Sequence, residues 1–152
     1  MGLKPIEGKR ISLVTDVAIA KDDLVAQYVG EVLSREMYAN RERAEARRSQ
    51  NTYGMVVTDK EVIDARYVGG MARFANHSCE PNCNVERWEV AGETCCGLFA
   101  NRAIERGEEI TISYGFKLST DKVRQTTLAK LLATNYLTIS TAGEDQVLVR
   151  LF

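Results

Sequence analysis

Short runs of β-branched residues, separated by polar turns, constrain the fold of this chain more than any other feature. The runs lie at residues 10–15, 24–29, 53–58, 61–64, 85–90, 95–100 and 109–114. Runs of this length with turn residues between them are typical of strands. Apolar stretches such as 24–26 and 147–149 are far shorter than the roughly 20 residues of a membrane-spanning helix. The sequence therefore predicts a mainly β fold of many short strands.

One longer segment, residues 35–48, departs from this pattern. Ser34 precedes it as an N-cap, and neither Gly nor Pro interrupts it, so we expect a helix. Its arginines alternate with glutamates at helical spacings. Such alternation usually indicates a solvated face, which we expect here, and only occasionally a docking surface for nucleosomal DNA or an acidic partner. The arginines are Arg35, Arg41, Arg43, Arg47 and Arg48.

The C-terminal part of the chain predicts a further helix and strand. Ser119, Thr120 or Asp121 can cap a helix that runs to about Thr134, with apolar residues on one side. Residues 146–152 are typical of a closing strand. With 152 residues, 45% of them hydrophobic, the chain can form one globular domain with a substantial core.

Charge and termini narrow the classes of partner. The 20 Lys and Arg residues stand against 21 Asp and Glu residues, for a formal net charge of −1. This balance does not indicate a nucleic-acid binder that depends on counterion release, so any basic surface must be local. Residues 1–6 lack the apolar core of a signal peptide. We therefore expect an intracellular protein with no membrane association.

Four cysteines, Cys79, Cys83, Cys95 and Cys96, can in principle form two disulfides. An intracellular chain of this size does not need them for stability, so we expect free thiols. Their spacing also lacks the paired Cys-x-x-Cys knuckles of a structural zinc site. We predict no metal ligands in this sequence.

Residues 73–83, Arg-Phe-Ala-Asn-His-Ser-Cys-Glu-Pro-Asn-Cys, have too many hydrogen-bonding side chains for a simple strand. They include the only histidine of the chain, His77. A lone histidine is usually structural, and no Gly-x-Ser-x-Gly motif offers it a nucleophile. The residues around His77 therefore decide what this segment does.

The segment closely resembles the signature of the SET-domain protein lysine methyltransferases. The similarity continues over roughly residues 9–116, in the family's order and spacing. It is closest to the subfamily that methylates the histone H3 tail, in which a Trp follows on the next strand, here Trp88. The other matching segments are Tyr-Val-Gly-Glu at 28–31, Ile-Asp-Ala at 63–65, Gly-Leu-Phe-Ala at 97–100 and Gly-Glu-Glu-Ile-Thr-Ile-Ser-Tyr at 107–114.

The resemblance implies a fold of small curved sheets, in which the Asn-His-Ser-Cys segment threads beneath another loop to form a knot-like core. It implies a SET domain over residues 1–116, with the helix at about 35–48 inserted, and a C-terminal extension over 117–152. S-adenosylmethionine would bind on one face, and a lysine side chain would enter from the other through a narrow channel. In-line transfer of this kind depends on alignment and on the exclusion of water.

The resemblance also implies roles for individual residues. Tyr114 matches the catalytic tyrosine, whose hydroxyl and nearby carbonyls would polarise the methyl group, and Tyr28 is the second expected catalytic residue. Asn76 suits the methionine end of the cofactor, and His77 would offer mainly its backbone to the adenine. An apolar channel would lower the pKa of the lysine ammonium. The expected cofactor-binding residues are Arg10, Ile11, Ser12, Tyr53, Arg73, Phe74, Asn76, His77 and Tyr114, and the channel residues are Tyr28, Tyr53, Ile112 and Phe116.

Two positions of the expected site depart from the family's pattern. Arg10-Ile11-Ser12 stands where the family has a Gly-x-Gly cofactor loop. Side chains there can crowd the pocket or reshape it, or the change can reflect a local shift of alignment. Ile112 replaces the Phe or Tyr that regulates the number of methyl groups, which leaves that number open and favours higher methylation.

The family's trailing cysteine cluster, which joins the Cys79 position on zinc, is also missing, because no cysteine follows Cys96. The zinc site of the relatives is therefore incomplete here. We expect the helix over 121–134 to supply the missing wall of the channel with Val123, Leu128 and Leu131.

Two classes of function fit these residues. The first, which we expect, is an S-adenosylmethionine-dependent lysine methyltransferase that acts on a histone tail in the nucleus. The second is a catalytically inactive SET module that binds a peptide or serves as a scaffold. The changed Gly-x-Gly loop favours the second, and the retained tyrosines favour the first. A non-histone substrate stays open, other subunits of a chromatin complex are candidate partners, and we expect direct nucleic-acid binding to be weak or absent.

Overall fold

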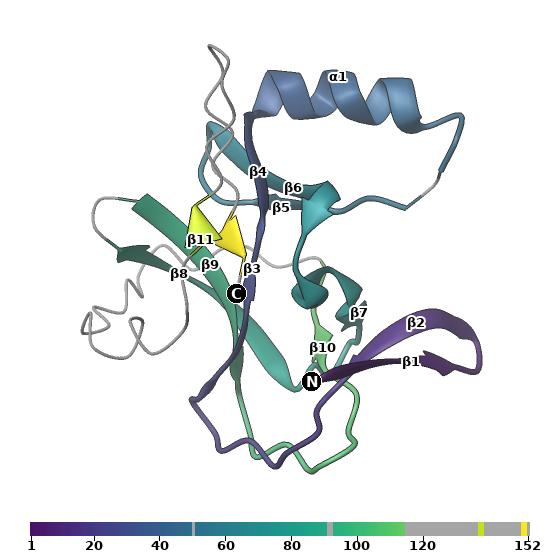
Figure 1. Ribbon diagram of the computed structural model, residues 1–152, viewed down its shortest axis with the longest axis vertical. Helices are drawn as coiled ribbons and strands as arrows, with labels where there is room; N and C mark the ends of the chain where they lie inside the picture. Colours follow the sequence, from purple (N-terminus) through teal and green to yellow (C-terminus); the bar gives the residue numbers. More distant parts are fainter. Residues whose placement is uncertain (50, 91–92, 115–136, 139–149, 152) are drawn as a thin grey trace. The chain divides into compact units, whose positions relative to one another are not determined.

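The computed structural model of the chain describes residues 1–49, 51–90, 93–114, 137–138 and 150–151. These residues form two compact units. The first holds residues 1–27 and 71–114, and the second holds residues 28–70 with the two short segments near the C-terminus. Strands dominate, which confirms the predicted mainly β fold (Figure 1). None of the described helices is long and apolar enough to cross a membrane.

The first unit consists of short strand pairs and one three-stranded sheet. β1 and β2 form an antiparallel hairpin that turns at Gly8. β8 and β9 form the predicted antiparallel hairpin, and the sheet has the order β3-β9-β8. A short 3-10 helix, η1, precedes β7 and was not predicted. The bounds are β1 Gly2–Ile6, β2 Lys9–Val14, β3 Leu24–Tyr28, η1 Met71–Phe74, β7 Asn76–His77, β8 Cys83–Val90, β9 Glu93–Ala100 and β10 Thr111–Ile112.

A large aromatic side chain lies at the centre of the three-stranded sheet. Trp88 is buried, and its ring meets that of Phe99 edge-on with the centroids 5.5 Å apart. A Cβ atom at Gly97 would lie 2.4 Å from the Trp88 ring. Glycine at position 97 therefore makes room for the indole against β9.

β7 and β10 form a parallel pair of two residues each. Asn76 lies opposite Thr111, and His77 lies opposite Ile112. The pair places the 73–83 segment beside the end of the described core at Tyr114. The strand predicted over 109–114 is wrong in length, because only Thr111–Ile112 is strand.

Side-chain hydrogen bonds explain why this strand is short. The side-chain oxygen of Asn82 accepts from the backbone N–H of Thr111 at 2.9 Å, and its nitrogen donates to the carbonyl of Glu109 at 2.7 Å. Asn82 thus binds backbone groups that a longer strand would need for its ladder. Asn82 is buried, and both its amide oxygen and its amide nitrogen are bonded, so it fixes the 73–83 segment against the backbone before and within β10.

The second unit contains one antiparallel sheet and one helix. The sheet has the order β4-β6-β5. It buries apolar side chains on both faces, Leu33 and Val62 on one and Met55 and Ile63 on the other. The bounds are β4 Gly30–Ser34, α1 Arg35–Glu45, β5 Gly54–Val56 and β6 Glu61–Gly69. The predicted turn at residues 59–60 joins β5 to β6.

α1 begins as predicted and ends three residues before the predicted limit of 48. The Ser34 hydroxyl accepts from the backbone N–H of Met37 at 3.2 Å, which satisfies an N-terminal amide. No residue of α1 is buried. The helix is instead fastened to β4 and β6 by polar side chains, chiefly Arg41, which pairs with Glu31 at 2.5 Å and Asp64 at 3.0 Å.

The predicted helix over 121–134, and most of the extension over 117–152, lie outside the described residues. Of the predicted closing strand over 146–152, Arg150–Leu151 forms β12, which pairs antiparallel with β11, Leu137–Thr138. The division of the chain into a SET domain and an extension stays a prediction.

Gly30 generates a prediction about stability. A Cβ atom there would lie 2.5 Å from the carbonyl oxygen of Asp64, which is backbone of β6 and cannot rotate away. We expect Gly30→Ala to lower the free energy of unfolding by about 2–3 kcal/mol, because the strands must separate. Urea unfolding measures this. Gly2→Ala, whose Cβ would meet nothing closer than 3.6 Å, should change stability by less than about 0.5 kcal/mol; equal losses would contradict the steric explanation.

Candidate functional site

Asn76 brings three acceptors of the first unit together at one side-chain atom. Its Nδ2 atom lies 2.8 Å from the Ser12 hydroxyl, 3.0 Å from a Glu109 carboxylate oxygen and 3.2 Å from the Ile11 carbonyl. Three acceptors around this atom fix the orientation of the amide, since a flipped amide would set oxygen against oxygen. β2 and the segment before β10 are thus tied to β7 through one side chain.

The residues at the expected cofactor loop lie in β2 and beside Asn76. Ser12 is fully buried and Ile11 is exposed, while Arg10 belongs to β2 by its backbone. The Ser12 hydroxyl adds an acceptor to Asn76 where the family's glycine would offer none. Ile11 and Ser12 therefore contact Asn76 in the first unit, and their role toward a cofactor stays a prediction.

Tyr114 is held at both ends. Its backbone N–H donates to Nδ1 of His77 at 3.1 Å, and its hydroxyl donates to the carbonyl of Ala75 at 3.0 Å. The His77 and Tyr114 rings lie 5.5 Å apart. Tyr114 is 62% exposed, so these contacts, rather than burial, set its position. The His77 ring thus has a structural contact, in line with the expectation for a lone histidine.

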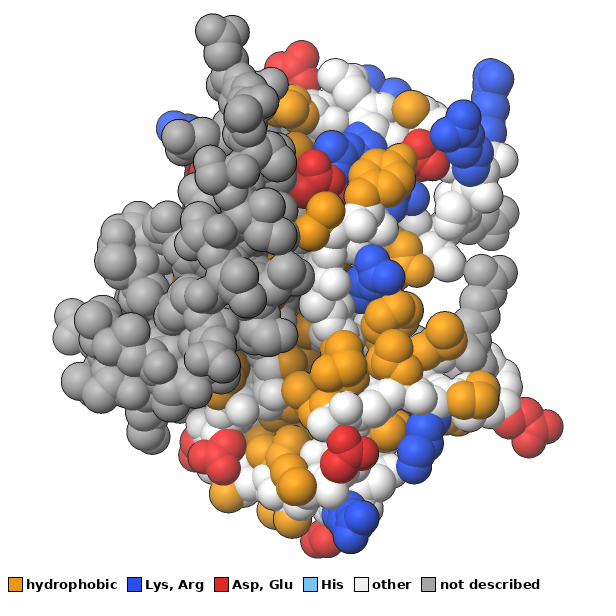
Figure 2. Space-filling view, in the orientation of Figure 1, with side chains coloured by type: hydrophobic (Ala, Val, Ile, Leu, Met, Phe, Trp, Pro, Cys, Tyr) orange, Lys and Arg blue, Asp and Glu red, His pale blue; other side chains and the backbone are white. Residues whose placement is uncertain are grey.

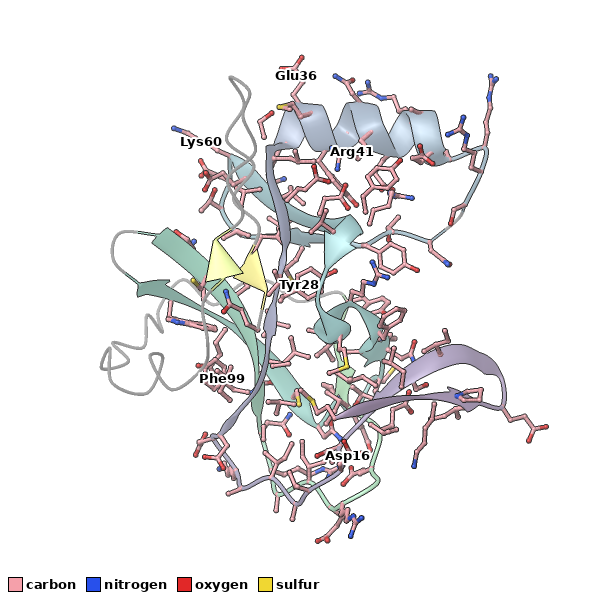
Figure 3. All side chains as sticks on the ribbon, viewed as in Figure 1. Asp16, Tyr28, Glu36, Arg41, Lys60 and Phe99 are labelled. Carbon is pink, nitrogen blue, oxygen red and sulfur yellow. The ribbon has the colours of Figure 1, made fainter. Side chains whose placement is uncertain are left out.

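Tyr28 and Tyr53 are brought together in the second unit. The Tyr28 hydroxyl donates to the Tyr53 carbonyl at 2.8 Å, and the Ala65 backbone N–H donates to the same oxygen at 3.0 Å. Tyr28 is buried, whereas Tyr53 is half-buried. Tyr28 lies near the centre of the view in Figure 3. Asn76, His77 and Tyr114 belong to the first unit, so the two groups of residues are defined separately.

The remaining expected site residues have simpler environments. Arg73 and Phe74 lie in η1, with the Arg73 guanidinium 4.8 Å from the centre of the Phe74 ring. Ile112 is buried in β10, and its carbonyl accepts from the backbone N–H of Ser78 at 3.0 Å. Phe116 lies outside the described residues. These placements neither support nor contradict the expected roles of the residues.

Three residues that support the site were not predicted: Asn82, Glu108 and Glu109. Asn82 donates to the Glu108 carboxylate at 3.1 Å, in addition to its bonds to β10. Arg102 donates to the same carboxylate at 2.5 Å and lowers the pKa of Glu108 to about 2. Two features of the sequence could have indicated these residues. They are the Pro-Asn pair in the 73–83 segment and the Gly-Glu-Glu turn before β10.

All four cysteines are free thiols, as expected. Burial raises the pKa values of Cys83 and Cys96 to about 12, so these thiols are protonated and unreactive. Cys79 is exposed, with its sulfur 3.8 Å from Nε2 of His77. Within the described part of the chain, no three His, Cys, Asp or Glu side chains are grouped to hold a metal ion.

The residues around Asn76 fit S-adenosylmethionine in part. The methionine end of the ligand carries an ammonium, which needs acceptors, and a carboxylate, which needs donors. Both protons of the Asn76 amide nitrogen face protein acceptors, but its oxygen makes no hydrogen bond within the described residues. The oxygen can therefore accept from an ammonium, whereas donors for the carboxylate must come from elsewhere.

Comparison with known proteins gives one family model and several relatives. The model of the SET domain matches residues 10–115. "Histone-lysine N-methyltransferase ASHH2" of Arabidopsis thaliana is 40% identical over 72% of this chain, and "Histone-lysine N-methyltransferase, H3 lysine-36 specific" of Schizosaccharomyces pombe is 39% identical over 71%. "Histone-lysine N-methyltransferase ash1" of Drosophila melanogaster is 40% identical over 68%. The chain spans only 6%, 14% and 5% of the lengths of these three relatives, respectively.

The Arg102–Glu108 pair predicts acid sensitivity. The folded-state pKa of Glu108, about 2, lies below its usual 4.5, so its stabilisation is complete above pH 4.5 and is lost as the pH falls toward 2. Glu108→Gln should lower stability at pH 7 by an amount on the order of 2 kcal/mol. It should also flatten the fall of stability between pH 4.5 and 2, as measured by urea unfolding.

The matched control for this prediction is Glu7→Gln, which removes the same charge at an exposed turn. Its stability profile between pH 2 and 4.5 should follow that of the unmodified chain. An unchanged profile for Glu108→Gln would show that the pair with Arg102 does not stabilise the fold.

Proposed function

The chain belongs to the SET-domain family, and from that premise we propose that it transfers a methyl group from S-adenosylmethionine to the amine of a lysine side chain in a histone tail. The observation that carries this proposal is the double anchoring of Tyr114 to His77 and Ala75. A catalytic hydroxyl must be held in place before substrate arrives, because positioning supplies most of the rate of an in-line transfer. The fixed Tyr114 meets that requirement.

Tyr114 and its surroundings would act through oxygen atoms. The Tyr114 hydroxyl donates its proton to the Ala75 carbonyl, and we assign its oxygen the role of acceptor toward the incoming amine. An acceptor so fixed can orient an amine and make weak CH···O contacts with a methyl group. When bound, S-adenosylmethionine supplies the activated methyl group. The Asn76 oxygen is the acceptor we assign to the ammonium of that ligand.

Tyr28 and Tyr53 would line the lysine channel. The buried Tyr28 hydroxyl is satisfied by the Tyr53 carbonyl, so the pair offers ring surface rather than free polar groups. An apolar lining disfavours an ammonium and favours the neutral amine that can accept a methyl group. Ile112 leaves room for more than one methylation step.

A histone tail as substrate, the nucleus as location, and association with other chromatin proteins rest on the names of the relatives, which are histone-lysine methyltransferases. The rival function is an inactive SET module that binds a peptide. One observation favours it: the amide nitrogen of Asn76 is occupied by Ser12, Ile11 and Glu109. Ligand titration decides between the two.

Calorimetric titration with S-adenosylmethionine or its demethylated product should show binding at micromolar to millimolar ligand. Tyr114→Phe should keep that affinity and lower methyl transfer to a histone H3 peptide by about 10²–10³-fold, because one fixed oxygen is lost from the transition state. No heat of binding at millimolar ligand would favour the inactive module. Binding with an unchanged rate in Tyr114→Phe would remove Tyr114 from the catalytic role.

His77 should act as a positioning residue for Tyr114. In His77→Asn the side-chain oxygen can replace Nδ1 as the acceptor for the Tyr114 N–H, and in His77→Leu no acceptor remains. We expect His77→Leu to lose at least tenfold in kcat, and His77→Asn to recover most of that loss. Equal losses in two folded variants would mean that the hydrogen bond from Tyr114 does not matter.

A further inference from the structure

The two glutamates near the end of α1 bind side chains of β6. Glu42 pairs with Arg66, and Glu45 accepts from the Tyr67 hydroxyl at 2.7 Å. Arg41 also turns toward the sheet, where it pairs with Glu31 and Asp64. The glutamates near the end of the helix are bound on its inner side. The alternation of Arg and Glu in the sequence therefore does not produce a solvated face of mixed charge there.

Three arginines lie on the outer side of the end of α1 and of the turn that follows it. Arg43, Arg47 and Arg48 are exposed, and the Arg48 side chain is 80% exposed, with only a loose contact to Glu45 at 3.7 Å. Arg43 donates to the neutral side chain of Asn40. Figure 2 shows Lys and Arg side chains gathered at the upper right, over the end of α1 and the turn that follows. We name Arg43, Arg47 and Arg48 the arginine surface.

We propose that the arginine surface binds the phosphate backbone of duplex DNA. The exposed residues between its arginines, Ala44 and Ala46, are small, and the exposed Tyr67 ring is engaged by Arg41 and Glu45. Residues 43–48 therefore offer none of the large apolar anchors that a protein interface needs. Phosphate contacts need only exposed cations and a close approach of the helix surface. Arginine also donates in a fork that matches a phosphate.

The charge balance sets the strength of this binding. Three neutralised phosphates give a slope of about −2.7 for the logarithm of the binding constant against the logarithm of salt concentration. The net charge of −1 for the whole chain adds no long-range attraction, so affinity should be modest and independent of base sequence. Such a contact adds to tail binding when histone and DNA are held together. It does not depend on catalysis, so it can fail while the proposed methyl transfer stands.

The test is fluorescence anisotropy of a labelled 30-base-pair duplex of arbitrary sequence, titrated with the full chain at several salt concentrations. We expect binding at low salt with a slope near −3. The triple variant R43Q/R47Q/R48Q should lose at least tenfold in affinity at low salt and most of the slope. Replacement of the same three residues by Lys should keep both, because lysine also neutralises phosphates.

The matched control is K4Q/K21Q/R106Q, which removes three exposed cations of the first unit and changes the net charge equally. It should bind the duplex nearly as well as the unmodified chain. Because arginines at a helix C-terminus also stabilise the helix, circular dichroism is recorded for each variant. The single variant Arg47→Gln, expected to reduce the slope by about one, carries the test if the triple variant loses helix.

Three outcomes would overturn the proposal. They are absence of duplex binding at low salt, an equal loss in the control variant, and a slope that does not change in Arg47→Gln. Displacement of the duplex by polyglutamate at equal charge concentration would assign the surface to an acidic protein instead.

Discussion

The parallel pairing of β7 with β10 is the constraint on which the rest of the first unit depends. Two strands of two residues each cannot hold together by their own ladder. Asn76 and Asn82 supply what the ladder lacks, since one binds β2 and Glu109 and the other binds the backbone before and within β10. Because Tyr114 follows β10 by two residues, these two amides help to set where its backbone lies, and the Ala75 carbonyl orients its hydroxyl.

In the second unit, an ion pair holds the helix to the sheet. Asp64 is fully buried, and Arg41 of α1 reaches it from outside the sheet. Removing one partner of a buried ion pair usually costs about 3–5 kcal/mol, because the other charge stays in an apolar environment. α1, which has no buried residue, is therefore held to the sheet by a few specific ion pairs and hydrogen bonds rather than by buried apolar surface. The same inward contacts engage Glu42 and Glu45, so Arg48 keeps only a loose contact to Glu45 at 3.7 Å.

Most elements of the fold could be predicted from local patterns, and the exceptions have physical causes. The β-branched runs predicted the β8–β9 hairpin, and Ser34 predicted the start of α1. Both predictions succeed because strand and cap preferences depend on residues that are close in sequence. The length of β10 could not be predicted, since Asn82 competes for its backbone from a distant position. Family resemblance pointed to Asn76 and Tyr114 as expected site residues, but not to Glu109, whose contact with Asn76 depends on a carboxylate reaching across to another strand.

The serine at position 12 is compatible with the geometry around Asn76. An amide nitrogen has two protons, and Ile11 and Glu109 already offer two acceptors. A glycine at position 12 would leave those two bonds in place, so the Ser12 hydroxyl is a third, additional acceptor rather than a replacement. Asn76 is therefore fixed by the crossing of β2, β7 and the segment before β10, whichever residue occupies position 12. A serine rather than a glycine at position 12 thus changes how many groups share the amide, not where the amide lies.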